Sequence, residues 1–420
     1  MTKISPPSEL TNDLAPSGSA GHRQQERQAI MVIAAVQFVN IVDFMMVMPL
    51  GPDFAKALGI RISHMGVLAG SYTMAAALSG FLGSFFLDRI GRRKALVMAV
   101  VGLAIGTAAG AFAMDFRSLL WARVLAGIFG GPATAIGFAI IGDIVPQERR
   151  GAALGKIMMG FSAASIFGVP AGLEVARIGG WNAPFIMVGS MAAVVAWWAH
   201  VKLPPLKTNL NRMKFDVSGG AFKSLLTQRT VLISYACLFC VMMGGFLIFP
   251  NIAGFVQINQ HFPREEMGRL YFIGGICSLI IMGTCGKLVD KFGSLPWFSL
   301  GSCGFLGTLY YGMYQSPPAL NAYSLFIGFM IFGTLRNISM QTLTSKVPRP
   351  SERAGFMSLQ SAVQHTAMSA GAISSARLLS SSPTGELIGI ESVVICSGIL
   401  VLLALGLVIV LDRAVCKSAH

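Results

Sequence analysis

The sequence contains about twelve apolar segments, each near the ~20 residues that a helix needs to cross ~30 Å of hydrocarbon. Because the interior of a bilayer offers no water to backbone N–H and C=O groups, these segments must fold as helices. The predicted fold class is an all-α membrane protein with twelve transmembrane helices. We place them near residues 30–48, 65–87, 95–114, 118–141, 152–177, 183–201, 231–255, 270–289, 296–314, 322–343, 356–379 and 392–411.

The composition excludes the other broad classes of protein. Charged residues make up 12% of the chain, where about 25% is usual in a soluble domain, and the mean hydropathy is +0.66. So few charges could not cover the surface of a soluble globule. All but one of the seven cysteines lie in or beside apolar segments, and small buried hydrophobic residues explain them better than metal or redox ligands do. We therefore expect no metal and no cofactor.

Basic residues outnumber acidic ones and give the chain a net charge of +14. In a membrane protein this excess has a simple explanation, because cytoplasmic loops are enriched in Lys and Arg. Most of the 32 basic residues fall on one side of the membrane when the N-terminus is placed inside. We therefore expect both termini in the cytoplasm, a location in the plasma membrane (the inner membrane of a bacterium) and no nucleic-acid partner.

The longest polar gap between helices, residues 202–230, divides the chain into two sets of six predicted helices. We expect an N-terminal six-helix bundle over 29–201, a cytoplasmic central loop over 202–230 and a C-terminal six-helix bundle over 231–411. Residues 1–28 are polar and lack the apolar core of a signal peptide, which predicts a disordered cytoplasmic tail. Residues 412–420 are expected to form a second cytoplasmic tail.

A short loop motif occurs once in each half of the chain. GSFFLDRIGRRK (Gly83 to Lys94) follows the second predicted helix, and GKLVDKFGS (Gly286 to Ser294) follows the eighth, so Asp88 and Asp290 occupy equivalent loops. Two parallel six-helix halves around a site near the membrane midplane form a transporter architecture.

Both loops resemble the signature motif of the major facilitator superfamily, G-x-L-a-D-r-x-G-r-k. The resemblance implies two pseudo-symmetric six-helix bundles, with loops that latch one gated state and release in the other. Glycine permits the tight turn, and the acid can meet a helix N-terminus or a nearby Arg. Ordinary positive-inside charge is the alternative for one loop alone. The matching residues are Asp88, Arg89, Gly91, Arg92 and Arg93 in the first copy, and Gly286, Asp290, Lys291 and Gly293 in the second.

Two further motifs lie within predicted helices. Arg123, Gly127 and Gly131 follow one another at intervals of four and resemble the Arg-and-Gly motif of helix 4 in proton-coupled members. Glycines at this spacing let a neighbouring helix approach, and an intramembrane Arg is usually functional. The fifth helix carries Gly168, Pro170 and Gly172, which resemble the motif of the efflux (antiporter) branch, in the form of the predicted sugar-efflux and arabinose-efflux permeases. These residues would bend the helix, and a structural kink with no influence on direction is the alternative.

Asp43 and Arg123 each lie about five residues from the outer end of their predicted helices, and hence at similar depth at about 1.5 Å per residue. We predict that they are close enough to pair. A carboxylate that alternates between Arg and a proton is a reasonable coupling device, and a static ion pair is the competing interpretation. Asn40 lies three residues before Asp43, so it could face the same cavity.

Other intramembrane polar residues are weaker candidates for the cavity. Glu174 could be a second acid near Asp43 or could reach the outer interface. Arg336 lies near mid-membrane with no acid in the apolar part of any C-terminal helix, so it needs Asp43, backbone carbonyls, water or an anionic substrate group. Gln364 and His365 lie on the eleventh helix, where His365 could carry a proton or bond between helices.

These features predict a secondary active transporter that moves a small molecule by alternating access, most simply a proton-coupled exporter. One alternative is an organic-anion uniporter or a proton symporter that imports its substrate. Another is a non-transporting receptor on the same scaffold. An enzyme is not expected, because no metal cluster, nucleophile elbow or phosphate loop has supporting context. The expected partners are a small-molecule substrate, protons and the lipid bilayer, and we expect a monomer.

Overall fold

The computed structural model describes residues 20–86, 90–204, 225, 227–348 and 353–418. Six predicted helices of the N-terminal half are present as α1 (Ala20–Met46), α3 (Met65–Phe86), α4 (Arg92–Gly110), α5 (Phe116–Ile144), a broken helix and α9 (Ala183–Lys202). The broken helix consists of α6 (Gln147–Met158), α7 (Gly160–Ala163), the π-helical η3 (Ala164–Gly168) and α8 (Val169–Gly179). A short α2 (Gly51–Leu58) and the 3-10 turn η1 (Ile62–His64) link α1 to α3.

The C-terminal half contains the other six predicted helices. They are α11 (Arg229–Gly254) with the π-helical η4 (Phe255–Asn259), α12 (Met267–Phe292) after the 3-10 turn η5 (Arg264–Glu266), α13 (Ser294–Leu309) with the π-helical η6 (Tyr310–Tyr314), α14 (Ala322–Thr344), α15 (Arg353–Leu378) and α16 (Ile390–Ser418). Strands β1 (Ser380–Ser381) and β2 (Leu387–Ile388) form a small antiparallel hairpin between α15 and α16. Among the described residues, eight helical segments are long and apolar enough to cross a membrane, and α3, α13, α14 and α15 complete the twelve.

Both predicted tails are shorter than the sequence suggests. Helix α1 begins at Ala20, so residues 20–28 are helical, and α16 runs on to Ser418 through most of the expected C-terminal tail. At the first end an ion pair of 2.9 Å between the buried Glu26 and Arg149 of α6 holds the start of α1 against the bundle. Residues 1–19 and nearly all of the central loop lie outside the described residues.

The helices form two bundles that follow the two halves of the sequence. In the first, α5 packs against α1, α3 and α4, while α9 packs against α1 and α4. In the second, α11 packs against α15 and α16, and α14 packs against α12 and α13. The major helix contacts between the bundles join α3 to α15, and α12 to η3 and α8.

The internal repeat of the sequence is also a repeat of the backbone. Gly91 precedes α4 with φ of 83°, and Gly293 precedes α13 with φ of 86°. Only glycine adopts this left-handed region at little cost. The two glycines have the same sequence separation as Asp88 and Asp290, so the backbone turns alike at the start of α4 and of α13.

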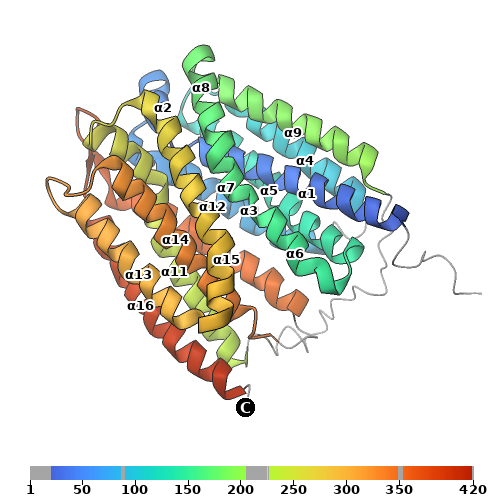
Figure 1. Ribbon diagram of the computed structural model, residues 1–420. Helices are drawn as coiled ribbons and strands as arrows, with labels where there is room; N and C mark the ends of the chain where they lie inside the picture. Colours follow the sequence, from blue (N-terminus) through green and yellow to red (C-terminus); the bar gives the residue numbers. More distant parts are fainter. Residues whose placement is uncertain (1–19, 87–89, 205–224, 226, 349–352, 419–420) are drawn as a thin grey trace, which may run out of the picture.

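Contacts between the bundles gather at one end of the molecule, which carries α2, η1, η5 and the β1–β2 hairpin and is called the α2 end. There Arg264 binds Asp53 at 2.8 Å and Gln257 donates to the Pro49 carbonyl at 3.0 Å. One helix turn deeper, Ser369 of α15 donates to the Gly70 carbonyl of α3 at 2.8 Å. Away from the α2 end the helices diverge, with α1, α4 and α9 running to the right in Figure 1 while α13 and α16 run downward.

Candidate functional site

Asp43 and Arg123 form an ion pair inside the N-terminal bundle. The Arg123 Nη1 atom donates to Asp43 Oδ1 at 2.8 Å, and the two side chains are 2% and 0% exposed. The pairing predicted from their depth in α1 and α5 is therefore confirmed. The same Oδ1 atom accepts a second hydrogen bond of 2.8 Å from the Thr107 hydroxyl of α4, so three helices meet at this carboxylate.

A chain of polar side chains continues from Arg123 along α1, away from the α2 end. The Arg123 guanidinium lies 4.6 Å above the Tyr72 ring, and the Tyr72 hydroxyl donates to Asn40 Oδ1. Asn40 donates in turn to the Thr134 hydroxyl at 2.8 Å and to the Gly130 carbonyl at 3.1 Å. The group is called the Asp43 cluster below, and its members are Gln37, Asn40, Asp43, Tyr72, Thr107, Arg123 and Thr134.

Two buried polar atoms of the Asp43 cluster have no partner among the described residues. They are Asp43 Oδ2 and Gln37 Nε2. Buried polar groups are nearly always hydrogen-bonded, so an unpartnered carboxylate oxygen beside a paired one marks a position where a proton could bind. Protonation would remove the charge that holds Arg123.

Glycines let α5 approach α3 closely enough to build this cluster. A Cβ atom on Gly127 would lie 2.3 Å from the Tyr72 carbonyl oxygen, and one on Gly131 would lie 2.3 Å from that of Ala76. Both positions are therefore closed to larger residues without a shift of one helix. This close approach sets the Tyr72 ring beneath Arg123.

The kink motif of the fifth predicted helix lies against α1 beside Asp43. The helix is interrupted by the π-helical turn η3, which ends at Gly168, two residues before Pro170. Both features are recognised causes of a bend. A Cβ atom on Gly168 would meet the Val42 side chain, the residue before Asp43, and one on Gly172 would lie 3.8 Å from Met46. On its other side, η3 packs against Gly275 of α12 in the second bundle.

Glu174 does not belong to the Asp43 cluster. Its carboxylate is more than half exposed on α8 and accepts from Arg177 of the same helix at 3.0 Å. Of the two alternatives given by the sequence, the exposed position agrees with a side chain at the outer interface and not with a second acid beside Asp43. Depth along a helix is set by residue number, but direction around the axis is not, and the η3 turn changes that direction.

Arg336 is buried in the C-terminal bundle against aromatic rings of α13. Its guanidinium carbon lies 4.6 Å from the centre of the Phe305 ring and 5.9 Å from that of Phe298. The side chain is 2% exposed, and its Nε and Nη2 atoms have no hydrogen-bond partner within the described part of the chain. The structure thus places Arg336 away from Asp43, although an unpaired buried guanidinium remains a candidate for an anion contact.

Gln364 and His365 are partly buried on α15, and neither is hydrogen-bonded to the Asp43 cluster within the described ranges. His365 Nδ1 lies 2.9 Å from the Ser361 carbonyl of its own helix. The structure therefore does not bring these two residues to the ion pair.

The two copies of the repeated loop motif differ in their contacts. Buried Arg92 binds Asp143 at the end of α5 at 2.7 Å, and Arg93 donates to the Leu203 carbonyl at 3.2 Å. Asp88 and Arg89 lie outside the described residues. In the second copy, Asp290 and Lys291 at the end of α12 are exposed. Gly286 lies within α12, and a Cβ atom there would meet nothing within 4 Å.

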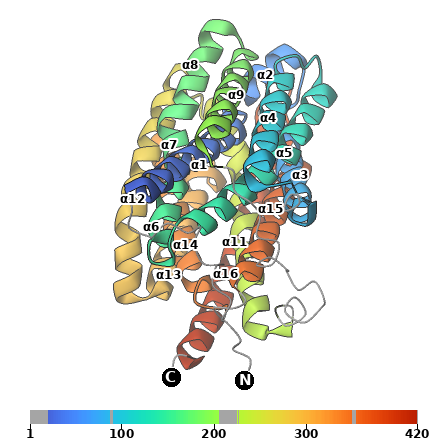
Figure 2. The ribbon, with the colours of Figure 1, turned by 90° about the vertical axis from the view of Figure 1, so that its right-hand side faces the viewer.

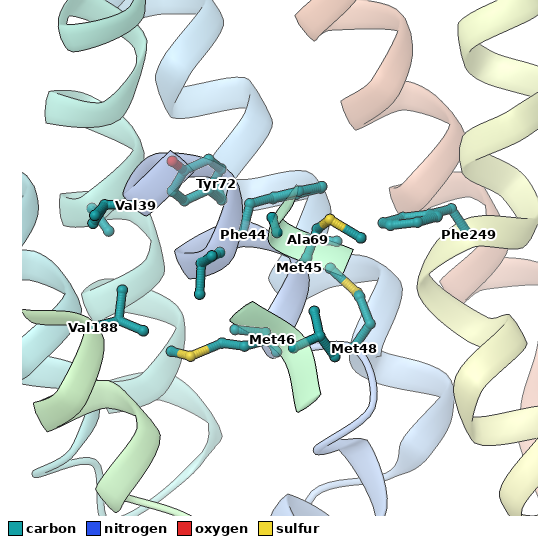
Figure 3. Close-up of a cluster of buried hydrophobic side chains, with 14 of the residues drawn as sticks. Val39, Phe44, Met45, Met46, Met48, Ala69, Tyr72, Val188 and Phe249 are labelled. Carbon is teal, nitrogen blue, oxygen red and sulfur yellow. The ribbon is translucent and has the colours of Figure 1, made fainter. Parts of the chain in front are cut away.

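An aromatic row, defined here as Tyr72, Phe44, Phe249, Phe329 and Phe305, joins the two buried arginines. Phe44 lies 5.5 Å from Tyr72 in its own bundle and 6.1 Å from Phe249 in the other, between ring centres. The Phe249 ring also contacts the Phe329 ring, and Phe329 contacts Phe305, whose ring lies against the Arg336 guanidinium. Figure 3 shows Phe44 between Tyr72 and Phe249.

The sequence interpretation missed several residues of this region, among them Tyr72, Thr107 and Thr134. Hydroxyl side chains are common packing residues in membrane helices, so type alone does not distinguish them. One signal was available for Tyr72, because it is the only tyrosine in the second apolar segment.

Comparison with known proteins agrees with this architecture. The family model of the Major Facilitator Superfamily matches residues 33–372. A bacterial homologue of the human lysosomal transporter Spinster, solved in an inward-facing and unoccupied conformation, superposes with a TM-score of 0.71 at 16% identity, over 95% of this chain and 99% of that one.

Two curated relatives cover much of the chain at low identity. The uncharacterized MFS-type transporter YwfA of Bacillus subtilis is 24% identical over 74% of each chain. The multi-drug resistance efflux pump PmrA of Streptococcus pneumoniae is 25% identical over 61% of this chain and 66% of its own length. The twelve-helix fold, the repeated loops and the match over most of the sequence lead to one conclusion: the chain belongs to the Major Facilitator Superfamily of membrane transporters.

Proposed function

We propose that the protein is a proton-coupled exporter of small molecules and that Asp43 is its proton site. It would work by alternating access in the plasma membrane, the inner membrane of a bacterium, with both termini in the cytoplasm. The observation that carries the proposal is the buried Asp43 carboxylate, with one oxygen held by Arg123 and Thr107 and the other without a described partner.

The chemistry of this carboxylate suits a coupling role. In the ionised form, Asp43 and Arg123 compensate each other in a buried site. A proton on Asp43 removes the negative charge that compensates Arg123, so the protonated cluster favours a different arrangement of α1, α4 and α5. Coupling requires only that proton and substrate prefer different states of the transporter.

The arrangement of the bundles supports an alternating-access cycle. With the termini in the cytoplasm, the α2 end is the outer end, and the contacts gathered there would close the outer side while the inner side stays open. Opening the outer side then requires the Asp53–Arg264 and Phe44–Phe249 contacts to separate. Phe44 directly follows Asp43, so a movement of α1 on protonation of Asp43 would also move the Phe44 ring and its contact with Phe249.

Efflux is supported by the position of the kinked helix. The turn η3 touches α1 at Val42 and α12 at Gly275, so it lies between the candidate proton site and the second bundle. The efflux pump PmrA is also among the relatives of the chain. The proposal of export thus depends on the kink motif of this helix and on this relative.

The test is made with purified protein in sealed vesicles, with a pH gradient imposed across the membrane and lumenal pH followed by a dye. Drugs, sugars and organic acids are added in turn. We expect at least one compound to collapse the gradient in wild-type vesicles and to have no such effect with Asp43→Asn. Full gradient collapse by the Asp43→Asn protein would reject Asp43 as the proton site.

A second candidate, transport of an organic anion by uniport or symport, is favoured by Arg336 alone. Its Nε and Nη2 atoms have no described partner, and an anionic substrate group could supply one. Arg336→Gln should then reduce binding of anionic compounds while sparing neutral ones, and Arg336→Lys should retain part of it. Equal loss for both classes of compound would assign Arg336 to packing against α13.

A further inference from the structure

Helices α4 and α9 enclose a long apolar groove on the outside of the N-terminal bundle, where Figure 2 shows them side by side. The groove has a volume of about 670 Å³. Its walls are large side chains that are at least half exposed, and its floor consists of small residues. The walls are Ile105, Phe112, Ile186 and Trp197, and the floor residues are Ala104, Ala108, Gly189 and Ala193.

The small floor residues explain why the groove is narrow. A Cβ atom on Gly189 would lie 3.1 Å from the Ala104 carbonyl oxygen and from the Ala108 methyl group, so the two helices approach closely there. Between Val97 and Phe112 the groove follows α4 for about 22 Å at 1.5 Å per residue. One leaflet of hydrocarbon is about 15 Å thick, half of the ~30 Å core. The groove is therefore long enough for one lipid acyl chain.

The end of the groove away from α2 carries positive charge. His200 lines it, and Lys94 and Lys202 are exposed at the adjoining ends of α4 and α9. Arg93 of α4 donates to the Leu203 carbonyl just beyond α9, which holds these two ends together. Neither helix contains an Asp or Glu to neutralise the cations. Trp197 beside His200 is a residue type enriched at the edge of the hydrocarbon layer.

We infer that this groove is a binding site for an anionic phospholipid. One acyl chain lies along α4 and α9, and the phosphate contacts Lys94, His200 and Lys202. A zwitterionic lipid could fill the apolar part equally well, but it would gain less from two lysines with no acid on either helix. The site lies on the lipid-facing side of the bundle, and its occupancy does not depend on the transport mechanism proposed above.

The test uses the purified full chain and native mass spectrometry, with phosphatidylglycerol and phosphatidylcholine of identical chains as probes. Wild-type protein should retain phosphatidylglycerol more strongly, and each cation removed in Lys94→Gln and Lys202→Gln should reduce that preference about fivefold. The matched control is Lys156→Gln with Lys346→Gln, two exposed cations on α6 and after α14. This control should keep the preference.

A second variant tests the apolar part of the site without changing charge. Ala193 is an exposed floor residue, so Ala193→Trp fills the groove with little effect on the core. Ala193→Trp should lower retention of both lipids. In a separate measurement, brominated phosphatidylglycerol should quench the tryptophan fluorescence of the wild type more than that of Trp197→Phe. Equal retention of the two lipids by wild type, an equal loss of preference in the control variant, or a lipid-free dimer that covers α4 and α9 would each overturn the inference.

Discussion

Phe44 of α1 and Phe249 of α11 stack across the boundary between the two bundles, with ring centres 6.1 Å apart and an interplanar angle of 11°. The two residues come from different halves of the chain, and Phe44 is the direct neighbour of Asp43 in sequence. The contact that closes the bundles at the α2 end therefore begins one residue from the buried ion pair. We therefore expect a change of charge at Asp43 to alter the Phe44–Phe249 contact as well.

We expect Phe249→Ala to increase the fraction of molecules that are open at the α2 end. An aromatic pair contributes about 0.5–1.5 kcal/mol beyond its buried area, so the open fraction should rise between about twofold and tenfold. Spin labels at the exposed Lys56 and Glu386, one in each bundle, would report the change in distance. Phe167→Ala removes an exposed ring from η3 and should leave the distribution as in wild type. No difference between the two variants would contradict a closing role for Phe249.

The ion pair between Asp53 and Arg264 should also stabilise the closed arrangement of the two bundles at the α2 end. Their side chains are 21% and 27% exposed, so the pair is partly screened, and its removal should shift the equilibrium less than about tenfold. Arg264→Ala should increase opening between the Lys56 and Glu386 labels, and the charge exchange Asp53→Arg with Arg264→Asp should restore closure in part. A double-mutant cycle with additive effects would show that the two residues do not act as a pair.

Gly127→Ala should destabilise the N-terminal bundle, because its new Cβ atom would lie 2.3 Å from the Tyr72 carbonyl oxygen. We expect a loss of a few kcal/mol, which is usual when a packed core is overfilled. Gly142→Ala is the matched control in the same helix, since nothing lies within 4 Å of its Cβ position. Thermal unfolding in detergent should separate the two variants. Equal melting temperatures would mean that α3 and α5 can move apart at no cost.

The start of α5 should carry an acid-sensitive contribution to stability. The Ser118 hydroxyl and backbone N–H both donate to Asp115, and they lower the pKa of this carboxyl below its ordinary 3.8. Because the folded pKa is lowered, the contribution is fully present above the unfolded value and is lost as pH falls through the folded one. Asp115→Asn should therefore lower the melting temperature at neutral pH and make less difference in strong acid. An equal difference at both pH values would contradict this cap.

Sequence reasoning located the helices and the central ion pair for different physical reasons. Helices follow from hydrocarbon thickness, and the Asp43–Arg123 pair follows from depth, which residue number fixes at a known rise. The position of Glu174 could not be chosen between the two alternatives, because depth along a helix does not fix the direction in which a side chain points. Tyr72 and Thr107 escaped notice because their roles depend on which helices touch, and that depends on glycines such as Gly127 whose partners are distant in sequence.

The lack of an acid near Arg336 was visible in the sequence, but its neighbours were not. Phe298 and Phe305 lie on α13, the helix that precedes α14 and Arg336 in the chain. Their rings face the Arg336 guanidinium and stabilise its charge by cation–π contacts in place of a carboxylate. The aromatic row could not be anticipated either, because 28 phenylalanines offer many equivalent choices and only the three-dimensional fold selects the four that join Tyr72 to Arg336.

The central claim is that Asp43 couples a proton to substrate movement, and the most direct test separates coupling from transport itself. Vesicles containing the Asp43→Asn protein are assayed twice with a substrate identified in the pH-gradient screen, once for accumulation driven by a pH gradient and once for exchange of labelled for unlabelled substrate. Asp412→Asn, the same chemical change near the end of α16, is the control. We predict that Asp43→Asn abolishes gradient-driven accumulation and keeps exchange, while the control keeps both. Gradient-driven accumulation at the wild-type level in Asp43→Asn would contradict the account.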